Sequence, residues 1–181
     1  MNKTKSCSRV IGILALLLAA TASAQNILDN PYFDDGLNSW LALAPERVTW
    51  TNSMDFHVDD SMVIGSAELD SHEGMAVLAQ CVPVNDEVYV ATAWMNSSCP
   101  GQTLEVFWAD DGCIVSPANI SAQSTITNAW QQITAFGAPT PGSTHAVVTL
   151  LNPSACGKSA FFDVVSFQPD YIFADNFEIA F

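Results

Sequence analysis

The sequence predicts an all-β protein, an antiparallel β-sandwich, from three observations. Short runs of β-branched, aromatic and aliphatic residues are separated by Asn, Asp, Gly, Ser and Pro throughout the chain after residue 24. No stretch there has a convincing helical period of 3.6 residues. The run Val88–Met95 is almost apolar on both faces, as expected of a central strand. Regularly spaced short strands of this kind are typical of a sandwich.

We expect nine strands, taken in chain order. Proline residues fall between the runs, where a missing backbone donor costs little. The polar stretch Ala109–Ala129 is expected to be the longest interior loop. The expected strands are Ile27–Phe33, Arg47–Trp50, Met62–Leu69, Met75–Val82, Val88–Met95, Thr103–Trp108, Trp130–Phe136, His145–Leu151 and Ala160–Phe167.

Residues 1–24 have the pattern of a secretory signal peptide. A basic start with Lys3, Lys5 and Arg9 precedes an apolar run that ends before the small residues Ala22-Ser23-Ala24. That run is shorter than the ~20 apolar residues that span a bilayer, so a retained membrane anchor is the weaker alternative. We therefore expect an exported protein with one domain over residues 25–168, and a tail or extra edge strand over 169–181.

The chain is strongly acidic. Its formal net charge is −14, and removal of residues 1–24 leaves 19 acidic residues against Arg47 and Lys158, a net charge of −17. Such a surface repels nucleic acid and anionic membranes and favours neutral ligands and metal cations. A role of the acidity in solubility alone is an equal alternative.

Four cysteines follow residue 24, namely Cys81, Cys99, Cys113 and Cys156. An even number in an exported domain predicts two disulfides, for which three connectivities are possible. Their spacing does not match a compact zinc site.

Motifs of catalysis are weak in this sequence. The three histidines are scattered, and neither a nucleophile elbow nor a His-Glu-x-x-His motif occurs. Asp59-Asp60 and Asp110-Asp111 are candidate carboxylate pairs for glycoside hydrolysis. Both pairs lie in polar, turn-like contexts, which favours solvated turns and a protein that is not an enzyme.

Aromatic side chains are the candidates for a ligand platform, because sugar C–H faces pack on aromatic rings. Alternation along Val88–Met95 places Trp94 on one face and Tyr89 on the other. In Thr103–Trp108, the same alternation predicts that Trp108 faces the core and Glu105 the exterior. Among the aromatics, Trp50, Phe56 and Trp94 remain the candidates for carbohydrate contact.

The chain from residue 26 to 168 resembles a CenC-type carbohydrate-binding module, which is a galactose-binding-like β-jelly roll. The opening Asn26…Phe33-Asp34-x-Gly36…Trp40 resembles the start of that family, and the later segments resemble its inner and closing strands in the same order. These segments are Gly65–Leu69, Gln80-Cys81-Val82-Pro83-Val84, Tyr89…Trp94, Trp130, Ala138-Pro139, Ala146–Leu150 and Phe161–Phe167.

The resemblance implies a structural calcium ion where the first and last strands meet. Its ligands would be the carbonyls of Tyr32 and Gly65 and the side chain of Asp163, with Asp34 as an additional carboxylate. Asp163 is notable by itself, because it interrupts an apolar run where an unpaired charge is costly. The alternative is that its side chain points outward into solvent.

The resemblance also favours a Cys81–Cys113 disulfide, which leaves Cys99–Cys156, and implies that Trp40 and Trp130 pack in the core. The function it implies is non-catalytic binding of a polysaccharide or oligosaccharide by a secreted monomer. The alternatives are a structural or adhesive surface protein that keeps the fold without a sugar site and, more distantly, a small glycoside hydrolase.

Overall fold

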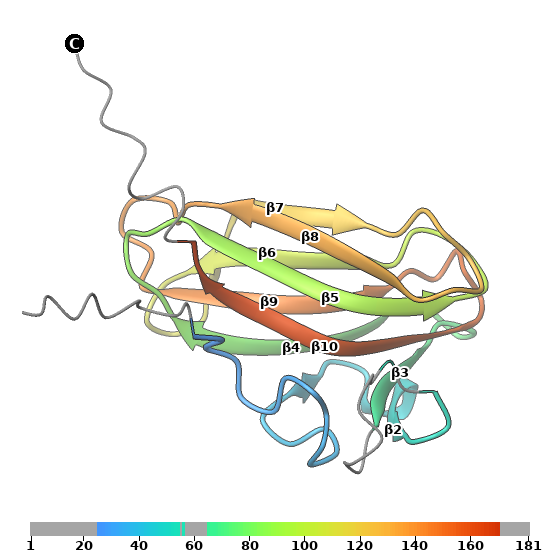
Figure 1. Ribbon diagram of the computed structural model, residues 1–181. Coiled ribbons are helices and arrows are strands. Elements are labelled where there is room, and N and C mark those ends of the chain that lie inside the picture. The colour runs from blue at the N-terminus through green and yellow to red at the C-terminus, as the bar shows by residue number, and fades with distance from the viewer. Residues whose placement is uncertain (1–24, 55, 57–64, 171–181) are drawn as a thin grey trace, which may run out of the picture.

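The computed structural model describes residues 25–54, 56 and 65–170, and these form two five-stranded antiparallel sheets packed face to face (Figure 1). The first sheet has the order β1-β4-β9-β6-β7 and the second the order β2-β3-β10-β5-β8. The predicted antiparallel β-sandwich is therefore confirmed. The strands are β1 (Leu41–Ala42), β2 (Val48–Thr51), β3 (Ser66–Asp70), β4 (Ala76–Pro83), β5 (Tyr89–Ser97), β6 (Thr103–Ala109), β7 (Val115–Gln123), β8 (Gln131–Gly137), β9 (His145–Asn152) and β10 (Ser159–Pro169), with a 3-10 turn, η1, at Pro45–Arg47.

The core lies between the sheets and is filled by alternate residues of the inner strands. Tyr89, Ala91, Ala93 and Met95 of β5 are buried, whereas the residues between them are half-buried. In β6, Trp108 is 2% exposed and packs in the core, as the alternation of the sequence predicts. Trp40 is also buried, as expected. Burial of these large side chains supplies most of the free energy that holds the two sheets together.

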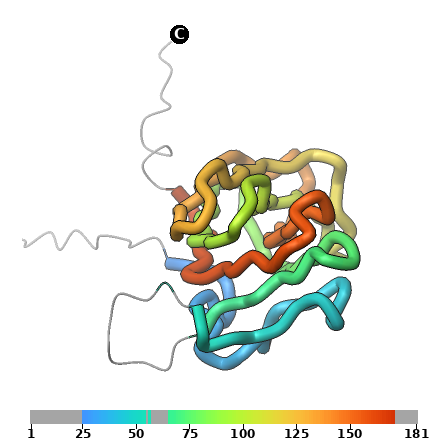
Figure 2. Tube along the Cα trace, turned by 90° about the vertical axis from the view of Figure 1, so that its right-hand side faces the viewer, coloured from blue at the N-terminus to red at the C-terminus, as the bar shows by residue number. Residues whose placement is uncertain are grey.

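The prediction of a strand at Ile27–Phe33 is wrong. The segment 26–40, here called the opening segment, is irregular chain with turns, and Asn30 and Phe33 have positive φ values of 47° and 55°. It lies beside β10, as the blue and red tubes of Figure 2 show, and is joined to it by Ile27 N–H donating to the Phe167 carbonyl at 2.9 Å. Hydrogen bonds from a side chain take the place of regular backbone pairing with β10. Asn26 donates to the Val165 carbonyl at 2.9 Å and accepts from the Phe167 N–H at 2.9 Å.

The expected loop over Ala109–Ala129 is also wrong, because β7 forms within it. Residues Ala118, Ile120 and Ala122 pack against the core, and the residues between them are exposed. This alternation is the period of a strand. Pro117 is tolerated because β7 is the edge strand of its sheet.

Both expected disulfides are confirmed. Cys81–Cys113 joins β4 to the turn after β6, and Cys99–Cys156 joins the loops that precede β6 and β10. Next to the second bridge, the buried Gln102 amide donates to Ser97 Oγ and to Asn152 Oδ1, both at 3.2 Å. The Asn152 amide donates in turn to the carbonyls of Leu69 and Lys158. This network ties both sheets at one end of the sandwich, where it satisfies buried polar groups.

The predicted signal peptide, residues 62–64 of the third expected strand and most of the C-terminal tail lie outside the described residues. At the start of the tail, Asp170 N–H donates to the Val88 carbonyl at 2.7 Å. Within the described part of the chain, no helix has the length and apolar character needed to cross a membrane.

The Asn26 contacts can be tested by replacing this residue with alanine. The substitution removes hydrogen bonds to Leu28, Val165 and Phe167, so we expect the free energy of unfolding in urea to fall by about 1–3 kcal/mol. Asn38→Ala is the matched control, because this exposed side chain bonds only to the Asp35 carboxylate, and it should change stability by less than about 0.5 kcal/mol. Equal stability of the two variants would contradict the assignment.

Candidate functional site

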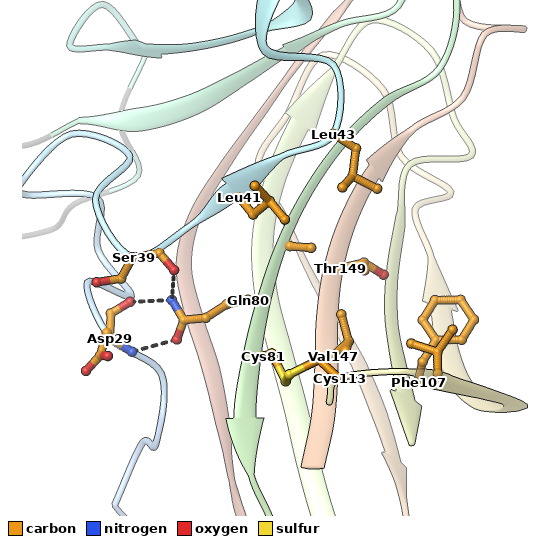
Figure 3. Close-up of a pocket in the computed structure, with 12 residues that line it drawn as sticks. Asp29, Ser39, Leu41, Leu43, Gln80, Cys81, Phe107, Cys113, Val147 and Thr149 are labelled. Atoms are coloured by element: carbon orange, nitrogen blue, oxygen red, sulfur yellow. Dashed lines mark hydrogen bonds between the residues drawn. A yellow bond between two sulfur atoms is a disulfide. The ribbon is translucent and has the colours of Figure 1, made fainter. Parts of the chain in front are cut away.

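A groove of about 730 Å³ crosses the outer face of the β1-β4-β9-β6-β7 sheet (Figure 3). Ala79, Val147 and Thr149 form its floor, and Phe107 lies beside them. Leu41 and Leu43, at β1, form one wall. Val115 and the Cys81–Cys113 disulfide close the opposite end. The lining is therefore mostly apolar.

Strand register explains why these side chains share one face. Leu41 pairs with Ala79, Ala79 with Thr149, and Thr149 with Glu105. In the neighbouring row of outward-facing residues, Cys81 pairs with Val147, and Val147 pairs with Phe107. Partners opposite each other in a sheet point to the same side. Because the residues between them fill the core, these two rows are turned to solvent.

Polar side chains continue both rows onto β7. Glu105 pairs with Ser121, and Phe107 pairs with Asn119. Both β7 residues are exposed and Glu105 is half-buried. The outer face of this sheet therefore changes from aliphatic at β1 to polar at β7.

Gln80 positions the aliphatic wall of the groove, which Leu41 and Leu43 form. Its side chain is turned toward the opening segment, as the dashed bonds of Figure 3 show. Its Oε1 accepts from the Asp29 N–H at 2.8 Å, while its Nε2 donates to the Asp29 carbonyl at 2.9 Å and to the Ser39 carbonyl at 3.1 Å. Ser39 stands two residues before β1, so this clamp sets where Leu41 meets β4.

The three predicted carbohydrate-contacting aromatics lie elsewhere. Trp94 projects from the outer face of the other sheet, where Phe56 stacks on it with ring centroids 3.7 Å apart. Trp50 is separate from this pair. Its Nε1 donates to the Phe33 carbonyl at 2.8 Å, and its indole lies so close to Gly65 that a Cβ there would be 2.1 Å from Nε1.

The expectation that Trp130 packs in the core is wrong. Trp130 is half-buried and lies tilted against Phe56, with ring centroids 5.6 Å apart. It precedes β8 on the same side as the exposed residues Gln132, Thr134 and Phe136. Phe56, Trp94 and Trp130 thus form one cluster on the outer face of the β5–β8 pair, here called the aromatic cluster.

Among the predicted calcium ligands, Asp163 is a buried carboxylate. This side chain is completely buried, so the alternative of a solvated outward carboxylate is wrong. Its Oδ2 accepts from the Phe56 N–H at 3.0 Å and its Oδ1 from the Val164 N–H at 2.7 Å. The pairing of β10 with β5 shifts between Asp163 and Ser166, and Val164 has a positive φ of 47°. Such a bulge re-aims side chains locally.

The opening segment passes close to this bulge. Val165 N–H donates to the Pro31 carbonyl at 2.8 Å, which brings Tyr32, the next residue, close to β10. Tyr32 and Asp34 are exposed, and Gly65 is buried under Trp50. Across the described ranges, no three His, Cys, Asp or Glu side chains group as metal ligands. A cation beside Asp163 would thus take mostly backbone carbonyl oxygens, a donor set that calcium accepts.

A smaller hollow of about 300 Å³ is lined by Glu46, Arg47, Asp70, His72 and Glu73. The backbone N–H of His72 donates to the Asp70 carboxylate, and this bond and a second from the His72 ring lower the pKa of Asp70. Glu46, His72 and Glu73 are exposed, Arg47 and Asp70 are half-buried, and the lining has no apolar floor on which an organic ligand would pack.

The groove is not predictable from local sequence patterns, because the residues that line it are distant along the chain. The signal for Phe107 was present, since alternation in β6 places it on the same side as Glu105. The run Leu41-Ala42-Leu43 after the buried Trp40 was a second signal. What the pattern does not reveal is that β1 pairs with β4, which brings these residues together.

No protein-family model and no curated protein matches this sequence. Solved structures with a similar sandwich include several carbohydrate-binding modules. The module TmCBM61, solved in complex with β-1,4-galactotriose, has a TM-score of 0.56 and 17% identity, over 81% of this chain and 99% of that one. The module titled "Family 16 Carbohydrate Binding Module-2" has a TM-score of 0.58 and 14% identity, over 78% of this chain and 99% of that one.

Two further structures widen the comparison. The CBM22-1 xylan-binding domain of Paenibacillus barcinonensis Xyn10C has a TM-score of 0.56 and 13% identity, over 81% of this chain and 92% of that one. The enzymatically active domain of tailspike protein 4 from bacteriophage CBA120 has a TM-score of 0.63 and 14% identity. The match covers 80% of this chain but only 21% of the tailspike chain. At such low identities these likenesses show the fold alone.

The role of Gln80 as a clamp can be tested with Gln80→Leu, which keeps the size of the side chain and removes three hydrogen bonds. We expect a loss of about 2–4 kcal/mol of stability in urea. The Leu43 N–H, which donates to the Val77 carbonyl, should exchange with deuterium faster, while that of Val148 in the core strand should change less. Gln132→Leu on the exposed face of β8 is the control. Unchanged exchange at Leu43 would refute the clamp.

Proposed function

We propose that this protein is an exported, non-catalytic carbohydrate-binding protein of the CenC type, and that it binds a neutral oligosaccharide or polysaccharide in the groove. The observation that carries the proposal is the groove itself, an open apolar trough beside a polar strip on one sheet of a jelly-roll sandwich. Two structures of similar fold, one in complex with β-1,4-galactotriose and one named a xylan-binding domain, support a carbohydrate over other small ligands.

The groove has the two kinds of surface that a sugar needs. A pyranose ring presents C–H groups that pack on apolar and aromatic side chains, here Phe107, Val147 and Leu41. Its hydroxyls need polar partners, which Glu105, Asn119 and Ser121 supply along one side. A chain of sugars lying across β4, β9 and β6 would meet both surfaces at once.

The aromatic cluster is a second candidate site for sugar contact. Trp50, which lies apart from this cluster, is a third. Phe56 covers one face of Trp94, and the Trp50 N–H is committed to Phe33. A ligand there would use the remaining ring surfaces. The groove is the stronger candidate because it is recessed and thus removes more of a ligand from water.

Catalysis has less support. In the sequence-predicted pair Asp110-Asp111, Asp110 Oδ1 accepts from the N–H groups of Gly112 and Ile114, as in a turn-stabilising aspartate. Asp59 and Asp60 lie outside the described residues. A structural or adhesive role without sugar binding is the main alternative function. Two disulfides support an oxidising compartment outside the cytoplasm, and we propose a monomer.

We also propose a structural calcium ion beside Asp163, held by its carboxylate, by the carbonyls of Tyr32 and Gly65, and by Asp34. A buried carboxylate is costly unless its charge is compensated, and a divalent cation is one group that compensates it. A divalent cation would fix the opening segment against β10.

Carbohydrate binding is tested by affinity electrophoresis against soluble neutral polysaccharides, such as galactan and arabinoxylan. We expect retardation by at least one of them, and its loss in Phe107→Ala, because this variant removes the one aromatic ring that lines the groove. Phe136→Ala is the matched control, since Phe136 is 66% exposed on the other sheet. Retardation lost in Trp94→Ala and kept in Phe107→Ala would move the site to the aromatic cluster. Absence of retardation by every glycan would favour the adhesive alternative.

The calcium proposal is tested by thermal unfolding after treatment with chelator. Calcium at about a hundred times its Kd should raise the Tm by about 5–10 °C, because a ligand bound only by the folded state adds about 2.7 kcal/mol. Asp163→Asn and, to a lesser degree, Asp34→Asn should reduce the rise, and Asp35→Asn next to it should not. A wild-type Tm that is insensitive to calcium would show that no such ion is bound.

A further inference from the structure

Two of the polar side chains that line the groove, Gln80 and Thr149, form hydrogen bonds within the protein. The Gln80 amide uses its oxygen and its nitrogen on Asp29 and Ser39. The Thr149 hydroxyl donates to the Glu105 carbonyl at 3.2 Å. A bare sugar hydroxyl pressed onto this floor would lose water without gaining a partner, which costs free energy.

Exposed aliphatic groups dominate the wall. Leu41 and Leu43 are 64% and 63% exposed, and Val115 across the groove is 49% exposed. Side chains of this kind contribute methyl contacts rather than a flat aromatic platform. They match a ligand that carries its own methyl groups.

The charge of the groove excludes anionic ligands. Asp29 lines it and Glu105 lies next to it on the same sheet face. Arg47 and Lys158, the two strong cations after residue 24, are absent from the lining. Uronate or sulfate groups would meet repulsion without a compensating cation.

We infer that the preferred ligand of the groove is an O-acetylated neutral polysaccharide, with acetyl methyls lying against Leu41, Leu43 and Val147; this inference rests on the proposed function. Acetylation replaces a hydroxyl donor by an ester and adds a methyl group. Both changes suit a surface where Gln80 and Thr149 already form hydrogen bonds within the protein and where Leu41 and Leu43 are exposed. The polar strip on β7 then meets the hydroxyls that remain unmodified.

The test compares two glycans with and without their acetyl groups. Acetylated glucomannan and acetylated galactan are each run in affinity gels beside the same polymer after mild alkaline deacetylation. Burial of one acetyl methyl should tighten binding about fourfold. Leu43→Ser should abolish this preference, so that the acetylated and the deacetylated polymer retard the variant equally. The control is Ile126→Ser, because Ile126 is a 49% exposed aliphatic residue in the loop before β8, outside the groove lining.

The possible outcomes separate this inference from the proposed function. Equal or tighter binding of the deacetylated polymers overturns the acetyl preference and leaves carbohydrate binding in place. Binding to none of the four polymers counts against both the acetyl preference and carbohydrate binding. Retention of the protein on phosphatidylcholine vesicles, without binding to any polymer, also counts against both. A preference for acetylated polymer that persists in Leu43→Ser and Leu41→Ser would place the acetyl groups outside the groove and overturn the inference.

Discussion

The bidentate clamp of the Gln80 side chain on the opening segment is the interaction on which the functional face depends. It lies at 6% exposure and holds the segment at two points, Asp29 and Ser39, so its three hydrogen bonds form away from competing water. The second point leads directly into β1. Without it, a strand of two residues at a sheet edge would have little to fix it. The wall of the groove is thus an edge element stabilised from inside the sandwich.

The same opening segment also contacts β10, the middle strand of the other sheet. Asn26 bonds to the backbone of β10, and Pro31 accepts from Val165 beside the bulge at Asp163. One irregular segment therefore links the groove on one face with the buried carboxylate on the other. A cation at Asp163 would strengthen this link, and stabilisation at that position would be transmitted to β1 through the chain between Tyr32 and Ser39.

Short apolar and aromatic runs between turn residues made most of the strands predictable, and the alternation in β6 also assigned its two faces, with Trp108 inward and Glu105 outward. The opening segment was not predictable as irregular chain. Its composition is β-like, and the positive φ values at Asn30 and Phe33 depend on tertiary contacts. β7 was missed because its inward residues are mainly alanines, which carry a weak apolar signal. The groove escaped prediction for a different reason: Leu41, Phe107 and Val147 meet only through the strand order β1-β4-β9-β6, which local patterns do not encode.

We propose that the groove on the outer face of the β1-β4-β9-β6-β7 sheet, whose wall is positioned by Gln80, binds a neutral glycan. The most direct measurement is an NMR titration of the isotopically labelled protein with a neutral oligosaccharide, observing methyl and aromatic side-chain resonances. We expect saturable shifts of the methyl resonances of Leu41, Leu43 and Val147 and of the ring resonances of Phe107. The indole resonances of Trp94 should not change. Shifts confined to Trp94 and its neighbours, with the groove methyls unmoved, would contradict this proposal.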